Sequence, residues 1–330
     1  MLKDFTVDKI VDAIGINETN TVLLHFWGED DDRQQLHLFG YAIAKTGASS
    51  ITLQQSRETN ARLFNSRNKQ LGDNYYRLFD MVDVVIDICM YQPVVPGKEM
   101  SPEGMALYRE HMRKLFPLFA QKEKFVQIRI PTKANAADTL LSEDDFITRM
   151  EQAYDIDYNK LRSSCIQKIG ELHSKKAITL LTGADHKLTF DLEGRSWLID
   201  AGDGDFPCGE VYIAPNETLT NGTVYFDTLF LEDVGEFSKI TLTVEDGRII
   251  MSDQNSFNDF LSELPENGNV VCELGIGLNP NVTTLSGYTV LDEKMLGTVH
   301  LGIGMNVTFG GTNNSPVHMD LVHGGSCKLI

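Results

Sequence analysis

The spacing of apolar residues changes character near residue 175, and this change restricts the chain to a two-domain fold. Before it, short apolar runs such as 21–27 and 124–130 alternate with segments of helical periodicity such as 102–120. Strands that alternate with helices predict a mostly parallel sheet covered by helices. After it, helical periodicity fades and short strands dominate. We therefore predict an α/β fold with an N-terminal α/β domain over residues 1–175 and a β-rich C-terminal domain over residues 176–330.

The charge of the chain is also divided unevenly. The 330 residues carry 47 acidic and 29 basic side chains, a net charge of −18. Residues 1–175 hold 25 acidic and 22 basic side chains, whereas residues 176–330 hold 22 and 7. A chain this acidic repels phosphate, so we predict no nucleic-acid partner. The excess in the second half is either a solvated acidic surface or partly neutralised by bound cations, because carboxylates are hard oxygen ligands for divalent metals.

Several other classes of protein are disfavoured. The first 17 residues carry three aspartates and no apolar core of the signal-peptide type, so we predict a cytoplasmic protein. No apolar run approaches the ~20 residues that a membrane helix needs. The five cysteines are odd in number and form no CxxC pair, which argues against a disulfide framework and a thiolate zinc cluster. No nucleotide-binding signature follows any predicted strand, and no organic cofactor is predicted.

The candidate chemistry lies in the second half. Five residues there stand at strand ends that are punctuated by glycine or proline, and all five are of types that bind metals. We identify as candidate metal ligands Glu210, Glu273, His300, His318 and Asp320.

Local context supports this interpretation. In a strand, His318 and Asp320 share one face about 6–7 Å apart, and imidazole plus carboxylate is a common pair of metal ligands. Glu273 follows an apolar run in which a lone buried carboxylate would be costly without a cation. Each residue alone could be a satisfied histidine or a solvated carboxylate. Strand alternation places Cys272 on the face opposite Glu273, so we expect a buried free thiol there.

These residues carry a resemblance to a known family. The second half resembles the M29 family of metallopeptidases, the thermophilic aminopeptidase (aminopeptidase T) group. The matching stretches are Gly209-Glu-Val-Tyr-Ile-Ala-Pro215, Asn221-Gly-Thr-Val224, Glu273-Leu-Gly-Ile-Gly-x-Asn-Pro280, Asp292-Glu-Lys-x-Leu-Gly-Thr-Val-His300 and the terminal Gly310-Gly311 with His318-x-Asp320.

The resemblance implies an activity and a set of ligands. It implies a metallo-aminopeptidase, a hydrolase that removes N-terminal residues from small peptides and uses two divalent ions such as Zn, Co or Mn. It implies that the five candidates hold the ions and that Glu273 bridges them. A homodimer is implied as well. The family has a catalytic tyrosine seven residues after the position of His300, where this chain has Val307, so no catalytic residue is assigned.

A second resemblance keeps an alternative open. The chain also resembles 2,5-dihydroxypyridine 5,6-dioxygenase, over the stretches 214–217 and 310–320 and in overall length. That resemblance implies a single non-haem Fe(II) held by two histidines and a carboxylate. The chain keeps Glu210, Glu273 and His300 together, which favours the peptidase ligand set.

Overall fold

The computed structural model describes residues 1–93, 99–231 and 234–330, and it divides into two compact units. The first unit comprises Met1–Asp155 and Gly202–Pro207, and the second comprises Ile156–Ala201 and Cys208–Ile330. The sequence placed the boundary near residue 175. The chain instead divides after Asp155, because helix α8 (Tyr158–Leu172) packs against strands β7 (Leu198–Asp200) and β9 (Glu210–Ile213) of the second unit. Within the described residues, no helix is both long and apolar enough to cross a membrane.

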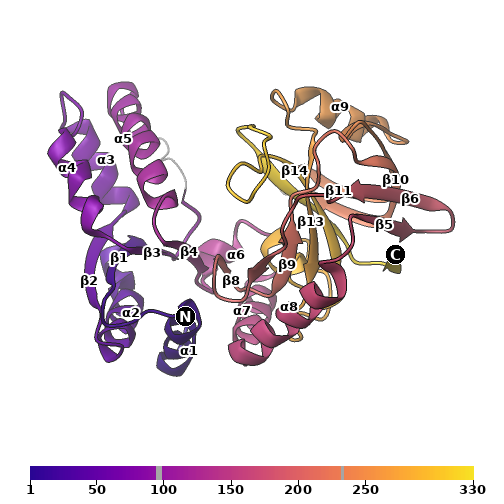
Figure 1. Ribbon diagram of the computed structural model, residues 1–330. Coiled ribbons are helices and arrows are strands. Elements are labelled where there is room, and N and C mark those ends of the chain that lie inside the picture. Colours follow the sequence, from indigo (N-terminus) through magenta and orange to yellow (C-terminus); the bar gives the residue numbers. More distant parts are fainter. Residues whose placement is uncertain (94–98, 232–233) are drawn as a thin grey trace. The chain divides into compact units, whose positions relative to one another are not determined.

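The first unit is built on one parallel sheet with the strand order β2-β1-β3-β4-β8 (Figure 1). The predicted α/β class is confirmed, and so is the parallel pairing of its strands. The strands are β1 (Thr21–Trp27), β2 (Ser49–Gln54), β3 (Val84–Cys89), β4 (Lys124–Arg129) and β8 (Asp205–Phe206). The helices are α1 (Asp4–Ile14), α2 (Arg33–Lys45), α3 (Arg57–Asn65), α4 (Asp73–Arg77), α5 (Pro102–Ala120), α6 (Lys133–Ala136) and α7 (Glu143–Tyr154), with 3₁₀ turns at Asp30–Asp32 and Leu78–Met81.

The central strands of this sheet explain the continuous apolar runs in the sequence. Every residue of β3 and all but the first of β1 are buried, as expected for strands covered on both faces. Two polar side chains, His25 and Asp87, lie side by side in this core, and Gln127 Nε2 donates to Asp87 Oδ2 at 2.7 Å. His25 Nδ1 is 2.7 Å from Asp87 Oδ1, and the indole of Trp27 donates to the same carboxylate at 2.7 Å. This pairing removes most of the cost of burying a carboxylate.

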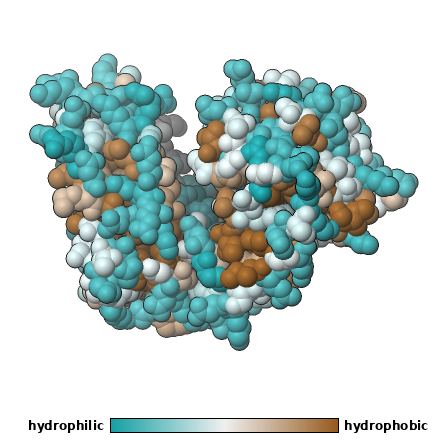
Figure 2. Space-filling view, viewed as in Figure 1, coloured by the Kyte–Doolittle hydropathy of each residue, from teal (hydrophilic) through white to brown (hydrophobic). Residues whose placement is uncertain are grey.

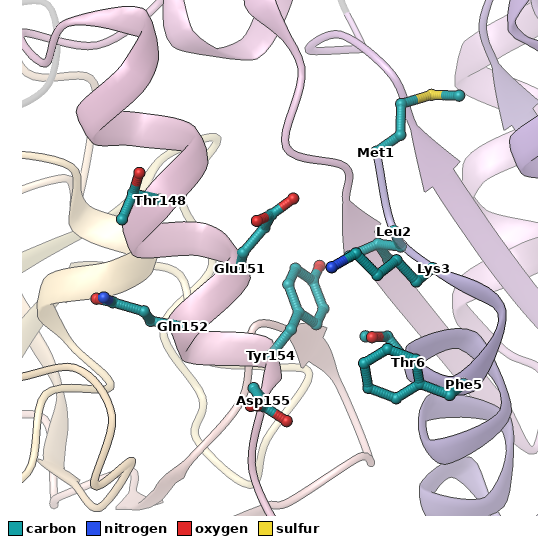
Figure 3. A pocket seen from close by; sticks show the side chains of 10 residues that line it. All are labelled: Met1, Leu2, Lys3, Phe5, Thr6, Thr148, Glu151, Gln152, Tyr154 and Asp155. Carbon is teal, nitrogen blue, oxygen red and sulfur yellow. The ribbon is translucent and has the colours of Figure 1, made fainter.

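The first unit also has a pocket of about 250 Å³ between α1 and α7 (Figure 3). Tyr154 forms part of its wall, and its hydroxyl donates to the backbone oxygens of Arg129 and Phe206. The pocket is lined by Met1, Leu2, Lys3, Phe5, Thr6, Thr148, Glu151, Gln152, Tyr154 and Asp155. The residues of this pocket all belong to the first unit, whereas the five candidate ligands all belong to the second.

The second unit contains two sheets whose paired strands are antiparallel. One has the order β12-β11-β10-β6-β5-β16 and the other β15-β14-β13-β9-β7 (Figure 1). The strands are β5 (Ala177–Thr182), β6 (His186–Asp191), β7 (Leu198–Asp200), β9 (Glu210–Ile213), β10 (Asn221–Leu231), β11 (Gly235–Glu245), β12 (Arg248–Ser252), β13 (Val271–Gly277), β14 (Val299–Gly304), β15 (His318–His323) and β16 (Cys327–Leu329). The helices are α8 (Tyr158–Leu172), α9 (Asn255–Glu263) and α10 (Thr289–Asp292).

In the five-stranded sheet, apolar and polar side chains alternate between the two faces, except at the start of β13. On one face the buried residues are Val211, Leu274, Ile276, Leu301 and Ile303. The opposite face carries the candidate ligands and several glycines. The period of two in the sequence therefore assigns one face to the core and leaves the other for chemistry.

Hydrophilic residues cover most of the visible surface of both units, with scattered apolar patches (Figure 2). This surface agrees with the high content of Asp and Glu, because many of these residues are exposed to solvent. The first of the two explanations for the charge excess, a solvated acidic surface, therefore holds for many of the acidic residues. It does not hold for Glu210 and Glu273, each of which is only 6% exposed.

The buried His111 makes the stability of the protein depend on pH. Burial lowers its pKa to about 4, and its ring stacks on Phe64 near the Tyr76 hydroxyl. An unfolded histidine has a pKa near 6.5, so the unfolded chain binds the extra proton between these two values. Above pH 6.5, the buried neutral His111 therefore takes nothing from the free energy of unfolding. This free energy decreases as the pH falls from 6.5 to about 4, and below that pH His111 causes no further change.

We expect the thermal midpoint of wild type to fall more steeply between pH 6.5 and 4 than that of His111→Gln. The exposed His37→Gln, in the same unit, is the control and should follow wild type. Parallel curves for wild type and His111→Gln would contradict the prediction.

Candidate metal centre

The five candidate residues come together on one face of the five-stranded sheet. Glu210 begins β9, Glu273 lies in β13, His300 in β14, and His318 and Asp320 in β15. The sequence spreads them over more than a hundred residues, but antiparallel pairing of β9, β13, β14 and β15 makes these strands neighbours.

Their potential ligand atoms form two groups that share Glu273. In the first, His300 Nε2 lies 3.2 Å from Glu210 Oε2 and 3.4 Å from Glu273 Oε1. In the second, His318 Nε2 lies 3.6 Å from Glu273 Oε2 and 3.6 Å from Asp320 Oδ1. Within each group the ligand atoms lie within 4.8 Å of one another. Glu273 thus turns one carboxylate oxygen to each group.

Glycines on neighbouring strands make room for these side chains. Each of the five pairs across the sheet with a glycine: Glu210 with Gly277, Glu273 and Asp320 with Gly302, His300 with Gly275, and His318 with Gly304. A Cβ at Gly275 would lie 1.9 Å from His300 Nε2, and one at Gly302 would lie 2.6 Å from the Glu273 Cβ. The two Gly-x-Gly stretches are therefore a packing requirement of the site.

A β-bulge alters the start of β13. The register shifts between Val271 and Glu273, so Cys272 does not alternate cleanly with its neighbour. Its Sγ lies 3.6 Å from His318 Nδ1, and this corrects the expectation that Cys272 lies on the opposite face. Burial raises the pKa of this thiol to about 11, so it stays a neutral thiol beside the histidine.

His318 is oriented by the backbone. Its Nδ1 lies 2.8 Å from the carbonyl oxygen of Met305, which accepts a hydrogen bond from that nitrogen. This contact leaves Nε2 free to bind a cation, which is the arrangement usual for metal-bound histidines. The side chain is 27% exposed, and it is the most accessible of the five.

Without a cation, the excess negative charge acts on the histidines. Burial lowers the pKa of His300, but the hydrogen bond to Glu273 and the charge of Glu210 outweigh burial and raise it to about 9. Burial also raises the pKa of Glu273. Protons on the imidazoles therefore compensate the carboxylates of the metal-free site, and bound cations would displace them.

A buried lysine cluster was missed by the sequence analysis. Lys294 Nζ lies 2.5 Å from Glu210 Oε1, 2.9 Å from Glu293 Oε1 and 3.5 Å from Asp200 Oδ2. Asp200 pairs with Glu210 across β7 and β9. The available signal was the run Asp292-Glu293-Lys294, which begins one of the stretches that carry the family resemblance. Lys294 occupies one oxygen of Glu210 and leaves the other facing His300.

The donor set fits divalent cations. Glu210 Oε2 and Asp320 Oδ1 are buried and have no hydrogen-bond partner among the described residues. Buried carboxylate oxygens without donors are costly. A cation held by Glu210 and His300, and another held by Asp320 and His318, would satisfy these two oxygens. Carboxylates combined with imidazoles suit Zn, Co or Mn. The ligand role of the five residues stays a prediction that this geometry supports.

Comparisons with known proteins agree with this chemistry. A family model described as thermophilic metalloprotease (M29) matches residues 48–328. Two solved structures share the fold: wild-type AmpT from Thermus thermophilus (TM-score 0.67, 15% identity, 98% of this chain and 94% of that one) and 2,5-dihydroxypyridine dioxygenase from Pseudomonas putida KT2440 (TM-score 0.66, 14% identity, 99% and 92%). No curated protein sequence matches the chain.

The glycine packing leads to a first prediction for the site. We expect Gly302→Ala to weaken the binding of Zn²⁺ by about 10- to 100-fold, because its Cβ would displace Glu273 and the His318 ring. Gly170→Ala in α8, where a Cβ meets open space, is the matched control and should bind as wild type does. Calorimetric titration of the metal-free proteins measures both, and equal affinities would refute the packing argument.

The lysine cluster leads to a second. Lys294→Gln leaves buried carboxylates without their cation, and we expect the metal-free protein to lose about 3–5 kcal/mol of stability. Added Zn²⁺ should reduce this loss, because cations replace part of the missing positive charge. Lys168→Gln, which breaks a surface pair with Glu171, should cost less than about 1 kcal/mol. A loss that is the same with and without metal would contradict the assigned role.

Proposed function

Since the chain belongs to the M29 family of thermophilic metalloproteases, and is therefore a metal-dependent peptidase, we propose that it removes amino-terminal residues from peptides at a centre of two divalent cations. The single observation that carries the proposal is the division of the ligand atoms into two groups around Glu273.

The proposed ligands follow these groups. Glu210, Glu273 and His300 hold one cation, and Glu273, His318 and Asp320 hold the other. Glu273 is the bridge, because its two oxygens face His300 and His318 separately. Three carboxylates offset most of the charge of two divalent ions, so the centre keeps a net positive character that favours Lewis-acid chemistry.

When bound, a pair of divalent cations lowers the pKa of water and polarises the scissile carbonyl. The chain itself must supply orientation and proton transfer. Glu293 is a buried carboxylate outside both groups, and it lies beside Lys294. We assign to its carboxylate the acceptance of the proton released by the attacking water, since a general base has to stand beside the reacting centre. Lys294 holds Glu293 and Glu210 in fixed positions for this role.

The charge of the second unit favours an amino-terminal substrate. A free α-amine is positively charged in solution, and the acidic surroundings attract it. The excess of 22 acidic over 7 basic residues after residue 175 is consistent with this preference. Removal of single residues from the amino end is therefore the activity that we favour over internal cleavage. A cytoplasmic location and a homodimer stay predictions from the sequence and the resemblance.

The iron dioxygenase alternative requires two histidines and one carboxylate around a single ion. In this chain His300 and His318 belong to different groups, each on its own oxygen of Glu273. This separation favours two ions over one. The solved dioxygenase shares the fold, and the family model describes a metalloprotease.

Metal analysis tests the proposal most directly. We expect about two Zn, Co or Mn ions per chain, and release of p-nitroaniline from Leu-p-nitroanilide in the presence of Co²⁺. Asp320→Asn should bind one ion fewer and lose at least 100-fold in kcat, since a neutral amide is a weaker ligand. Asp259→Asn, at an exposed position in α9, should match wild type.

Two results would count against the proposal. One iron per chain, with oxygen uptake on a dihydroxypyridine, would favour the dioxygenase instead. Full metal content in Asp320→Asn would remove that residue from the centre.

A further inference from the structure

We propose that the Tyr212 hydroxyl donates a hydrogen bond to the scissile carbonyl oxygen of the substrate. This inference rests on the proposed peptidase function and adds a residue to it. A peptide carbonyl gains negative charge when water attacks it, and a donor aimed at that oxygen accelerates the reaction.

The position of Tyr212 in the sheet supports the proposal. It stands two residues after Glu210 in β9, so both side chains leave the strand on the same face. In the sheet register Tyr212 pairs with Gly275, and Gly275 pairs with His300. The row therefore runs from the tyrosine to a proposed metal ligand with no side chain between them.

Aromatic contacts hold the Tyr212 ring. Its centroid lies 5.6 Å from that of Phe309 at an interplanar angle of 73°, and the Phe309 ring lies 5.7 Å from the His318 ring at 89°. Edge-to-face pairs of this kind are favourable and fix ring orientation. The ring of Tyr212 is thereby linked to the ring of His318, the most accessible of the five proposed ligands.

The hydroxyl of Tyr212 is available for a ligand. No hydrogen bond joins it to any described residue, whereas the hydroxyls of Tyr91 and Tyr154 are each hydrogen-bonded. A phenol with an ordinary pKa near 10 is neutral at pH 7, so this hydroxyl can donate a hydrogen bond.

Other candidate donors near the site are already engaged or absent. Lys294 is surrounded by three carboxylates. His300 and His318 are needed as proposed ligands. Val307, in the same loop as Phe309, has an apolar side chain that is 48% exposed and offers no donor. Tyr212, by contrast, offers a phenol on the same face of β9 as Glu210.

The attack of water on the scissile carbonyl needs no proton transfer by Tyr212. The water oxygen forms a bond to the carbonyl carbon, and the π electron pair moves to the carbonyl oxygen, which the Tyr212 O–H group then stabilises. The proton of the water passes to Glu293. When the C–N bond breaks, the electron pair returns to form the carboxylic product, and the leaving nitrogen receives the proton.

The test removes only the hydroxyl. Tyr212→Phe keeps the ring and its contact with Phe309, and we expect kcat for Leu-p-nitroanilide to fall about 100-fold with KM changed less than about 3-fold. Metal content and thermal midpoint should match wild type. Tyr225→Phe removes a hydroxyl that bonds to Asp227 in β10, and this control should keep full activity.

A binding experiment separates this inference from the proposed function. The probes for the Zn²⁺-loaded proteins are 1-amino-3-methylbutylphosphonate, which offers an oxyanion, and 3-methylbutylamine, which does not. We expect Tyr212→Phe to bind the phosphonate at least 10-fold more weakly and the amine equally well.

Each other outcome overturns the assignment in a distinct way. Unchanged kcat and phosphonate affinity in Tyr212→Phe would leave the peptidase proposal standing without Tyr212. Loss of metal or a lower thermal midpoint in that variant would make the hydroxyl structural. A wild-type protein that neither cleaves the substrate nor binds the phosphonate would overturn the peptidase function and this inference together.

Discussion

The burial of several carboxylates on one face of a five-stranded sheet is the constraint on which the rest of the second unit depends. Glu210 and Glu273 are each only 6% exposed, and desolvation of such groups costs several kcal/mol unless positive charge is near. The protein supplies part of that charge with Lys294 and two imidazoles. The remainder is left for cations, so the same arrangement that threatens stability creates affinity for metal.

This charge requires space, and the sheet provides it through glycine. Opposite each proposed ligand stands a residue without a side chain, while the other face of the same strands is filled by branched apolar residues. Packing energy is therefore gathered on one side of the sheet and chemistry on the other. Gly275 and Gly302 contribute no side-chain contacts to the sheet. The packing of the apolar face compensates for this and keeps the strands in register.

The sequence predicted those features that depend on local period, and it failed where the chain departs from it. The strand at 21–27 and the helix at 102–120 were predicted at their observed bounds, since continuous apolar runs and a proline-started helix leave strong signals. The shared face of His318 and Asp320 follows from alternation. Cys272 was misplaced because a bulge adds a residue that alternation cannot reveal. Lys294 was missed because its three carboxylate partners lie 84, 94 and 1 residues away, and only the fold brings the distant two to it.

The two units do not correspond to two continuous stretches of chain. Residues 202–207 return to the first unit, where β8 adds the outermost strand to the parallel sheet. During synthesis on the ribosome, that sheet can be completed only after about fifty further residues have emerged, by which time the beginning of the second unit is already exposed. A gene fragment that ends at Asp155 would therefore encode a sheet in which β4 is an unpaired edge strand, and such an edge is prone to pair with other copies. A protein fragment that contains the first unit alone must therefore retain residues 202–207 or replace them with a designed strand.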